Sequence, residues 1–318
     1  MPTFLHGKNT RVVLVNPNFT SQTFTATVTS GTAVITIVSA NLSLVPGMGI
    51  TAASGLPAGT VILSASGRSL TLSNNFTGTG TITFTASSTG IAYDISQFFN
   101  DVSVSFASEA AEITTFQTAG FKSYIAGLRE GNISLNGFYD GTITGVDAIL
   151  YTAIANTGDE GCIVFTDGNN SATSASRCYI TRGIETKYDL KSPVSGVVAV
   201  DTEIQADGGV WRGIGQNFTQ SGAATTYAPS TNGYDGGSAT TNGGLLIVGV
   251  TALTGTSPTV ALTFQHSPDQ STWTDLATSN TGGAVTIVGG SIYRYTRLRV
   301  VLGGTSPSAN IYYGFARF

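Results

Sequence analysis

Apolar and polar residues alternate in short runs along most of the chain. Because successive side chains of a strand point to opposite faces, this alternation predicts strands with one buried face. Between residues 20 and 89 the runs occupy 23–29, 34–38, 60–63, 69–72 and 81–85, with Gly or Pro turns between them. The segment predicts a small β-sandwich or barrel. A flexible linker is the alternative, although a linker does not require the apolar cluster at 61–63.

From residue 91 onward the alternation continues at 102–106, 133–136, 184–191 and 201–207. One segment has a different period, because the apolar residues Ile149, Leu150, Ala153 and Ile154 recur at helical spacing. Asp147 lies in the first turn of this segment, and Gly158 follows its end. The pattern predicts one α-helix over 146–156 in an otherwise β-rich domain.

The last third of the chain begins with a change of pattern. Residues 221–244 are rich in Gly, Ser, Thr and Asn, have no periodicity, and predict a linker. Alternating runs follow at 245–250, 259–265, 273–277, 284–288, 293–301 and 311–318. Their number and spacing predict a second β-sandwich.

Charged residues are unevenly distributed and support these borders. Arg68 is the one charged residue between 20 and 89, whereas 90–230 holds 15 of the 18 acids and 7 of the 14 bases. The predicted fold class is mainly β. We divide the chain into a discontinuous sandwich domain with one helix (1–19 and 90–220), an inserted β-module (20–89), a linker (221–244) and a C-terminal β-sandwich (245–318).

The composition agrees with a folded β protein of low charge. Of 318 residues, 10% are charged and 40 are Gly, while 41% are hydrophobic, which is too many for a disordered chain. The first 20 residues contain no apolar core of signal-peptide length, and the run 245–250 is too short to span a bilayer. We expect a protein made in the cytoplasm with no membrane anchor. Cys162 and Cys178 are expected to be reduced, with one disulfide as the alternative.

Residues suited to catalysis or metal binding are few. The two histidines, His6 and His266, are far apart in the sequence. The glycines of 209–215 lack the spacing of a dinucleotide turn and are expected in a turn or bulge. Asp159 and Glu160 are adjacent carboxylates, but the flanking glycines predict a solvated loop rather than a glycosidase pair. We expect no enzyme activity, no catalytic residue, no metal and no cofactor, and the acidity of 90–230 argues against tight DNA binding.

Four segments of the central domain carry a resemblance to a known family. They read YDISQFFNDVSVS (93–105), EITTF (112–116), SYIAGL (123–128) and GNISLNGFYDG (131–141). In this order they resemble the tail tube (major tail) proteins of long non-contractile-tailed bacteriophages. The resemblance covers roughly 91–207 together with 10–16, whereas 20–89 and 231–318 look like additions similar to the Ig-like or jelly-roll modules of such proteins.

The resemblance implies a structural virion protein whose hexameric rings stack into a tube for DNA delivery. Its partners would be further copies of itself, the tail tip, tape-measure and terminator proteins, and viral DNA in passage. Its location would be the virion tail, after assembly in the host cytoplasm. The resemblance also marks one loop as a candidate for ring stacking: Glu112, Thr114, Thr115 and Phe116.

Period-two alternation in 184–191 and 201–207 yields a second set of candidates. If the apolar set faces the core (Ile184, Tyr188, Leu190, Thr202, Ile204 and Ala206), the intervening acids face away from it. These acids are the candidate lumen-facing residues: Glu185, Asp189, Asp201, Glu203 and Asp207. Repeated carboxylates would keep DNA phosphates from adhering, and Lys187 and Lys191 would temper the charge. An ordinary solvated outer face is the alternative.

Two other classes of function stay open. One is a secreted or virion-surface adhesin that binds carbohydrate, and the other is a glycan-cleaving tail enzyme. An adhesin typically has an export signal and clustered aromatics, and an enzyme has convergent acids, so the sequence favours neither.

Overall fold

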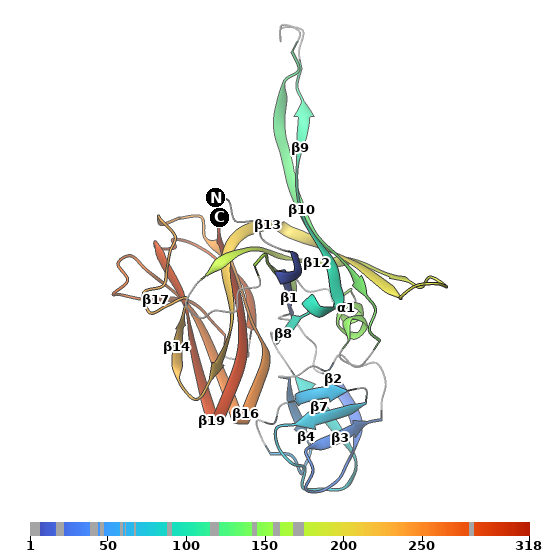
Figure 1. Cartoon of the computed structure of the whole chain (residues 1–318). Coiled ribbons are helices and arrows are strands. Elements are labelled where there is room, and N and C mark those ends of the chain that lie inside the picture. The colour runs from blue at the N-terminus through green and yellow to red at the C-terminus, as the bar shows by residue number, and fades with distance from the viewer. Residues whose placement is uncertain are drawn as a thin grey trace.

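The computed structural model describes residues 7–16, 22–38, 44, 48–57, 60, 62–66, 68–87, 91–114, 121–141, 145–154, 160–167, 175–279 and 283–318. Within them, strands dominate and one α-helix is present, so the mainly β fold class is confirmed. Figure 1 shows a barrel at one end, a large central sheet, a C-terminal sandwich beside it and a long hairpin that extends away from the body.

The described residues between 22 and 87 form a six-stranded barrel. Its strands are β2 (Gln22–Val28), β3 (Val34–Ile37), β4 (Gly49–Ala52), β5 (Ile62–Ser66), β6 (Ser69–Leu72) and β7 (Gly80–Ser87). They lie in the order β4-β7-β2-β3-β6-β5. The amides of Ile50 and Ile62 donate to the carbonyls of Thr60 and Met48, both at 2.9 Å, and thereby join β4 to β5. The predicted small β-structure is therefore present as a closed barrel, with β4 as a strand that the sequence pattern did not reveal.

Aromatic side chains fill the centre of this barrel. The ring of Phe84 lies 5.6 Å from that of Phe24 and 5.8 Å from that of Phe76, and all three are buried. Alternation explains the arrangement, since Phe24, Ala26 and Val28 point inward while Thr23 and Thr27 point to solvent.

The barrel is inserted between two paired strands of the central sheet. These are β1 (Arg11–Asn16) and β8 (Ile91–Asp94), in which Asn16 pairs with Ile91. The chain thus leaves the central sheet and returns to it at adjacent positions, which explains how 20–89 can differ so much in composition from its surroundings.

A second closed structure joins the central strands to the C-terminal strands. Starting from β1, the neighbouring strands in space are β11 (Glu160–Phe165), β12 (Ser176–Lys191) and β13 (Ala199–Ser221). They are followed by β19 (Tyr295–Arg317) and β16 (Gly244–Ser267). A single parallel pair, Val250 with Ile91, returns from β16 to β8. The expected border at 220–245 therefore does not separate two sheets, because β13 continues to Ser221 while pairing with β19.

Small residues allow the two layers of this structure to pack closely. A buried core contains Val13, Val15, Ile163, Ile180 and Ile247, from β1, β11, β12 and β16. Gly249 faces it so tightly that an added Cβ would lie 2.5 Å from the Ala92 Cβ and 3.0 Å from the Val15 Cγ2. The glycine is required here for approach of the layers rather than for a turn.

The C-terminal strands are fewer and longer than the sequence predicted. Runs 245–250 and 259–265 merge into β16, and runs 293–301 and 311–318 merge into β19, while β17 (Thr274–Ser279) and β18 (Gly283–Val288) flank β16. Gly255 and Gly304 have φ of 122° and 102°, and the pairing register shifts beside them. The residues between the predicted runs therefore form bulges that bend one long ladder, rather than connections between separate strands. Phe264 and Phe315, from its two halves, meet with ring centroids 4.6 Å apart.

The expectation that 221–244 lacks regular structure is wrong. The strands β14 (Thr225–Ala228) and β15 (Tyr234–Asp235) lie in this segment, and both pair with β19. The Arg297 guanidinium lies 4.1 Å from the ring centroid of Tyr227 and 3.8 Å from that of Trp273. Pairing and cation–π contacts with distant residues thus order a stretch that has little apolar content of its own.

We expect Gly249→Ala to destabilise the protein, because its methyl group would overpack the two layers. The expected loss is about 1–3 kcal/mol of unfolding free energy, measured by urea denaturation. Gly289→Ala is the matched control, since nothing lies within 4 Å of a Cβ at Gly289. Equal stability of the two variants would show that the layers are not packed as described.

Candidate functional site

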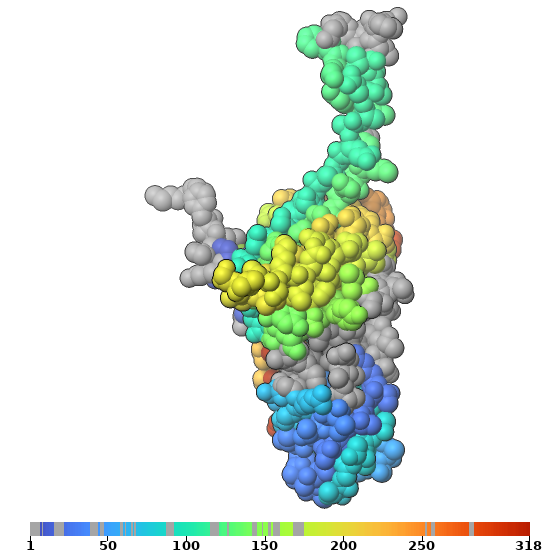
Figure 2. All heavy atoms as spheres, turned by 90° about the vertical axis from the view of Figure 1, so that its right-hand side faces the viewer, coloured from blue at the N-terminus to red at the C-terminus, as the bar shows by residue number. Residues whose placement is uncertain are grey.

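The most prominent surface feature is a two-stranded hairpin that leaves the body of the protein. It consists of β9 (Phe99–Glu112) and β10 (Tyr124–Phe138). Figures 1 and 2 show that its outer half contacts no other part of the fold drawn in colour. An isolated two-stranded ribbon is at best marginally stable in water. We therefore expect the outer half of this hairpin to contact a partner surface.

Large apolar side chains are exposed on that outer half. Phe121 and Leu128 are both 79% exposed, and three further side chains are about half exposed: Ile113, Tyr124 and Ile125. Scattered apolar residues are normal on a surface, but a group of five on one ribbon is typical of a contact site. The segments 112–116 and 123–128 that carry the family resemblance contain four of these residues, but the sequence does not show that they are exposed, because it does not show that the hairpin extends beyond the body.

The loop expected to stack rings lies at the tip of this hairpin. The Glu112 carboxylate accepts a hydrogen bond from Lys122 at 2.9 Å, and the Thr114 hydroxyl accepts one from the Ser123 amide at 3.1 Å. Thr115 and Phe116 lie outside the described residues. The interaction with Lys122 lowers the pKa of Glu112.

The base of the hairpin belongs to a four-stranded sheet in the order β12-β13-β10-β9. One face packs on α1 (Val146–Ile154), whose Val146, Ile149 and Leu150 are buried. The Tyr188 hydroxyl of β12 donates a hydrogen bond to Asp147 of this helix. The predicted helix is thus present, although its expected end at Asn156 and the following Gly158 lie outside the described residues.

The opposite face of this sheet is polar, and its residues form rows across the four strands. Residues paired across neighbouring strands share a face. One row is Ser103, Ser134, Glu203 and Lys187, and the next is Asp101, Asn136, Asp201 and Asp189. Asp189, Asp201 and Glu203 therefore lie together on one face as predicted, and Asp101 joins them although the sequence analysis did not select it.

Glu185 does not belong to this polar face, so the simple alternation predicted for 184–191 is wrong. The register of β12 shifts between Glu185 and Lys187, which leaves Thr186 without a partner residue on β13. Such a bulge reverses the faces on one side of it. As a result Glu185 is buried at 6% exposure, whereas Ile184, expected in the core, is 45% exposed.

Basic side chains and one amide pair with the acids of the polar face. Lys191 forms an ion pair with Asp201, and Arg182 forms one with Asp207. The Lys187 ammonium lies 3.2 Å from the Asp189 carboxylate. The Asn132 amide donates to Glu203 at 2.7 Å. The acids are therefore organised by local partners, and the lysines have the tempering positions that the sequence suggested.

Two edges of this sheet are open. Among the residues that the structure describes, β9 pairs only with β10, and β12 beyond Gly183 pairs only with β13. β9 has 14 residues, while the edge strands β14, β17 and β18 of the C-terminal part have four, six and six. Long edges with unpaired backbone groups are templates for a further strand. Their position at opposite ends of one sheet suits head-to-tail association.

Two buried carboxyl groups lie behind the sheet, on its core side. Glu160 is 2% exposed at the start of β11, so the solvated loop predicted for it is wrong, while Asp159 lies outside the described residues. Burial raises the pKa of Glu160 to about 7 and that of Glu185 to about 8. A hydrogen bond from the Thr202 hydroxyl opposes the second shift.

The other sequence candidates have structural positions. His6 lies outside the described residues, and the His266 Nδ1 accepts a hydrogen bond from the Tyr293 amide at 3.1 Å. Cys162 and Cys178 are free and buried, and burial raises the pKa of both thiols. Gly209 has φ of 108° in a bulge of β13, as expected for that glycine.

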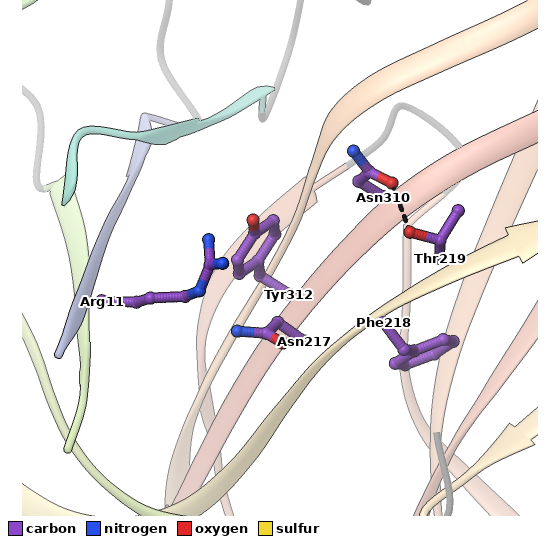
Figure 3. Close-up of a pocket in the computed structure, with 6 residues that line it drawn as sticks. All are labelled: Arg11, Asn217, Phe218, Thr219, Asn310 and Tyr312. Atoms are coloured by element: carbon purple, nitrogen blue, oxygen red, sulfur yellow. Dashed lines mark hydrogen bonds between the residues drawn. The ribbon is translucent and has the colours of Figure 1, made fainter. Parts of the chain in front are cut away.

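A small cavity of about 150 Å³ lies beside the N-terminal end of β1 (Figure 3). Arg11, Asn217 and Tyr312 point toward one another in it, and Thr219 donates to Asn310 at 2.7 Å. The Arg11 guanidinium and the Tyr312 hydroxyl both bond Asp94, at 2.7 and 2.8 Å. The side-chain amide of Asn217 has no hydrogen-bond partner among the described residues. These groups include no nucleophile with an adjacent base, and the cavity fits ordered water.

Within the described part of the chain, no three His, Cys, Asp or Glu side chains gather in a way that could hold a metal ion. No helix found there is long and apolar enough to cross a membrane.

Comparison with known proteins yields only partial structural overlaps. No family model and no curated protein matches the sequence. The tail of an empty gene transfer agent particle with C6 symmetry aligns with a TM-score of 0.30 and 16% identity, over 36% of this chain and 80% of that one. The native gene transfer agent virion aligns with a TM-score of 0.29 and 15% identity, over 36% and 82%. The Dit (gp 19.1) protein of SPP1 aligns with a TM-score of 0.29 and 12% identity, over 71% and 96%. Overlaps at this level do not assign the chain to a family.

The stability of the protein should depend on pH through Glu185. Because its folded pKa is about 8, above the unfolded value of about 4.3, the folded state holds this proton more tightly. Stability is therefore greatest below the unfolded pKa and falls as pH rises toward 8, by at most about 1.4 kcal/mol per pH unit for this one group.

Urea denaturation between pH 5 and 8 measures this effect, with Glu185→Gln as the test variant. The substitution keeps a hydrogen-bond acceptor for Thr202 and removes the titration, so the slope should flatten, with the contribution of Glu160 remaining. Glu109→Gln, at an exposed position of the hairpin, is the control. A slope in Glu185→Gln as steep as that of the wild type would contradict the burial of this carboxyl.

Proposed function

We propose that this chain is a structural subunit of a bacteriophage tail that associates with copies of itself into rings, and that the rings stack into a tube. The observation that carries the proposal is a four-stranded sheet whose two edges pair with no further strand among the described residues, together with a hairpin that projects beyond the body. The sequence resemblance of 91–207 to tail tube proteins supports it independently of the fold. The chain would act as a conduit wall and not as an enzyme.

Ring formation follows from the two open edges. If the β9 edge of one copy pairs with the distal β12 edge of the next, every copy offers both halves of the same contact. Such a head-to-tail contact generates a closed ring when its rotation closes, and the resemblance implies six subunits. The four-stranded sheets would then join into one continuous wall.

The polar face of that wall is proposed to line the lumen. The other face is covered by α1 and the core, which leaves the polar rows as the face of this sheet that is available to a lumen. Asp101, Asp189, Asp201, Glu203 and Asp207 would repeat around the channel with their lysine and arginine partners. A surface in which acids slightly outnumber bases repels a phosphate backbone without binding it, as DNA passage requires. Glu185 is excluded from this set because the bulge turns it toward the core, whereas Asp201, which is also buried, lies on the polar face beneath its partner Lys191.

Stacking of rings is proposed to use the hairpin tip. The exposed apolar residues Phe121 and Leu128 lie at the end farthest from the body, where they would reach a neighbouring ring. Burying them there would offset the marginal stability of the isolated ribbon. Glu112 and Thr114 at the same tip would add polar contacts.

Electron microscopy of concentrated protein tests this function. Wild-type protein should form rings that stack into tubes, whereas a double variant, Phe121→Lys with Leu128→Lys, should stop at single rings because charges replace the apolar stacking contact. Tyr151→Lys, at a 66% exposed apolar position of α1, is the matched control and should assemble normally. Circular dichroism shows whether each variant is folded.

The proposal fails if the folded wild type stays monomeric at every concentration. It also fails if the double variant forms tubes as readily as the control.

A further inference from the structure

A larger cavity, of about 400 Å³, lies where β12, β13 and β19 meet the β15 segment. Three arginines line it, Arg177, Arg212 and Arg317, together with Tyr234 and Thr296. These arginines come from three strands, and no pattern in the sequence groups them.

Strand register brings the three arginines to one face. Arg177 of β12 pairs with Ile214 of β13, and Tyr179 pairs with Arg212, so Arg177 and Arg212 are diagonal neighbours on that face. Ile214 in turn pairs with Phe315 of β19. Arg212 lies two residues from Ile214, and Arg317 lies two residues from Phe315. Alternation therefore places both arginines on the same face as this pair.

Arg317 is held rigidly by neutral groups. Its guanidinium donates to the carbonyl of Ser238 and, at 2.7 Å each, to the carbonyls of Tyr293 and Arg294. It also packs against Gly236, where a Cβ would lie 2.6 Å from the Arg317 Cζ. Burial lowers the pKa of this guanidinium, which nevertheless remains a cation at neutral pH. Its position is therefore fixed by neutral carbonyls, while the Asp235 carboxylate acts on it electrostatically and pairs directly with Arg294 instead.

None of the three arginines forms an ion pair with a carboxylate of the described residues. By contrast Arg11, Arg182, Arg294 and Arg299 each have one, with Asp94, Asp207, Asp235 and Asp275. Asp235, the acid beside the cavity, already accepts two hydrogen bonds from Arg294, at 2.7 and 2.6 Å. Three arginines thus line one cavity in a chain whose net charge is −4.

We propose that this cavity binds a phosphate ester. Guanidinium groups match the oxygens of a phosphate through paired hydrogen bonds, and three of them around one cavity suit a group of high negative charge. The volume admits one phosphate with a small organic substituent, which Tyr234 would contact. A DNA duplex does not fit, because its binding uses an extended basic surface that contacts many phosphates. The proposal is independent of the tube function.

Calorimetric titration of the full chain with inorganic phosphate and with glycerol phosphate tests the site. Both ligands should bind at low salt, glycerol phosphate more tightly because its substituent gains contacts, and added salt should weaken both. The double variant Arg177→Gln with Arg212→Gln should lose affinity about tenfold or more, since two charge-assisted contacts are removed. Arg317 is left intact because its removal endangers folding.

Arg129→Gln, at an exposed arginine of the hairpin, is the matched control and should bind like the wild type. Absence of binding at millimolar ligand, or equal affinity in the double variant, would overturn the site. If inorganic phosphate binds more tightly than glycerol phosphate, the cavity takes a free anion and the proposal of a phosphate ester is wrong. If the double variant instead changes only the self-association of the protein, the arginines belong to a contact between copies and the proposal is wrong.

Discussion

Backbone hydrogen bonding at the edges of the sheets is the constraint on which this structure depends. Every strand offers amide and carbonyl groups on both sides, and leaving a row of them unpaired invites another strand. The inserted module removes the problem by joining β4 to β5, and the central structure removes it by returning from β16 to β8. Along β9 and the distal part of β12 no such closure is present among the described residues. In the proposed ring, these are the positions at which neighbouring copies of the chain pair.

One bulge in β12 decides which side chains lie on each face of the open sheet. The bulge at Thr186 turns Glu185 toward the core and leaves Lys187 and Asp189 beside the acids of β13. Without it, one more carboxylate would lie on the polar face and an isoleucine would lie in the core. Because the buried Glu185 is close to neutral at pH 7, the core tolerates it, and the polar face keeps a modest excess of acid that its lysines and arginine partly balance.

Local patterns in the sequence were sufficient for much of this architecture. Alternation located four of the barrel strands within two residues at each end, and helical spacing located the start of α1 at Val146. Alternation also placed Asp189, Asp201 and Glu203 on a common face. These features depend on residues close in sequence, where side-chain period decides burial.

What the sequence did not reveal depends on distant partners. The segment 221–244 is ordered by pairing with β19 and by Arg297, and the glycines at 255 and 304 form bulges because a long partner strand lies beside them. The length of the hairpin, its apolar tip and the grouping of Arg177, Arg212 and Arg317 likewise follow from tertiary register. Composition and periodicity carry no signal for such contacts.

Hydrogen exchange of the β9 amides, followed as a function of protein concentration, is the most direct measurement. In an antiparallel edge strand about half of the amides point away from the partner and exchange quickly while they face water. If the edges join copies of the chain, those amides should be fast in dilute monomer and become protected as the protein assembles, together with the amides of 184–191. Exchange that is equally fast at all concentrations, in samples where tubes form, would show that assembly does not use these edges.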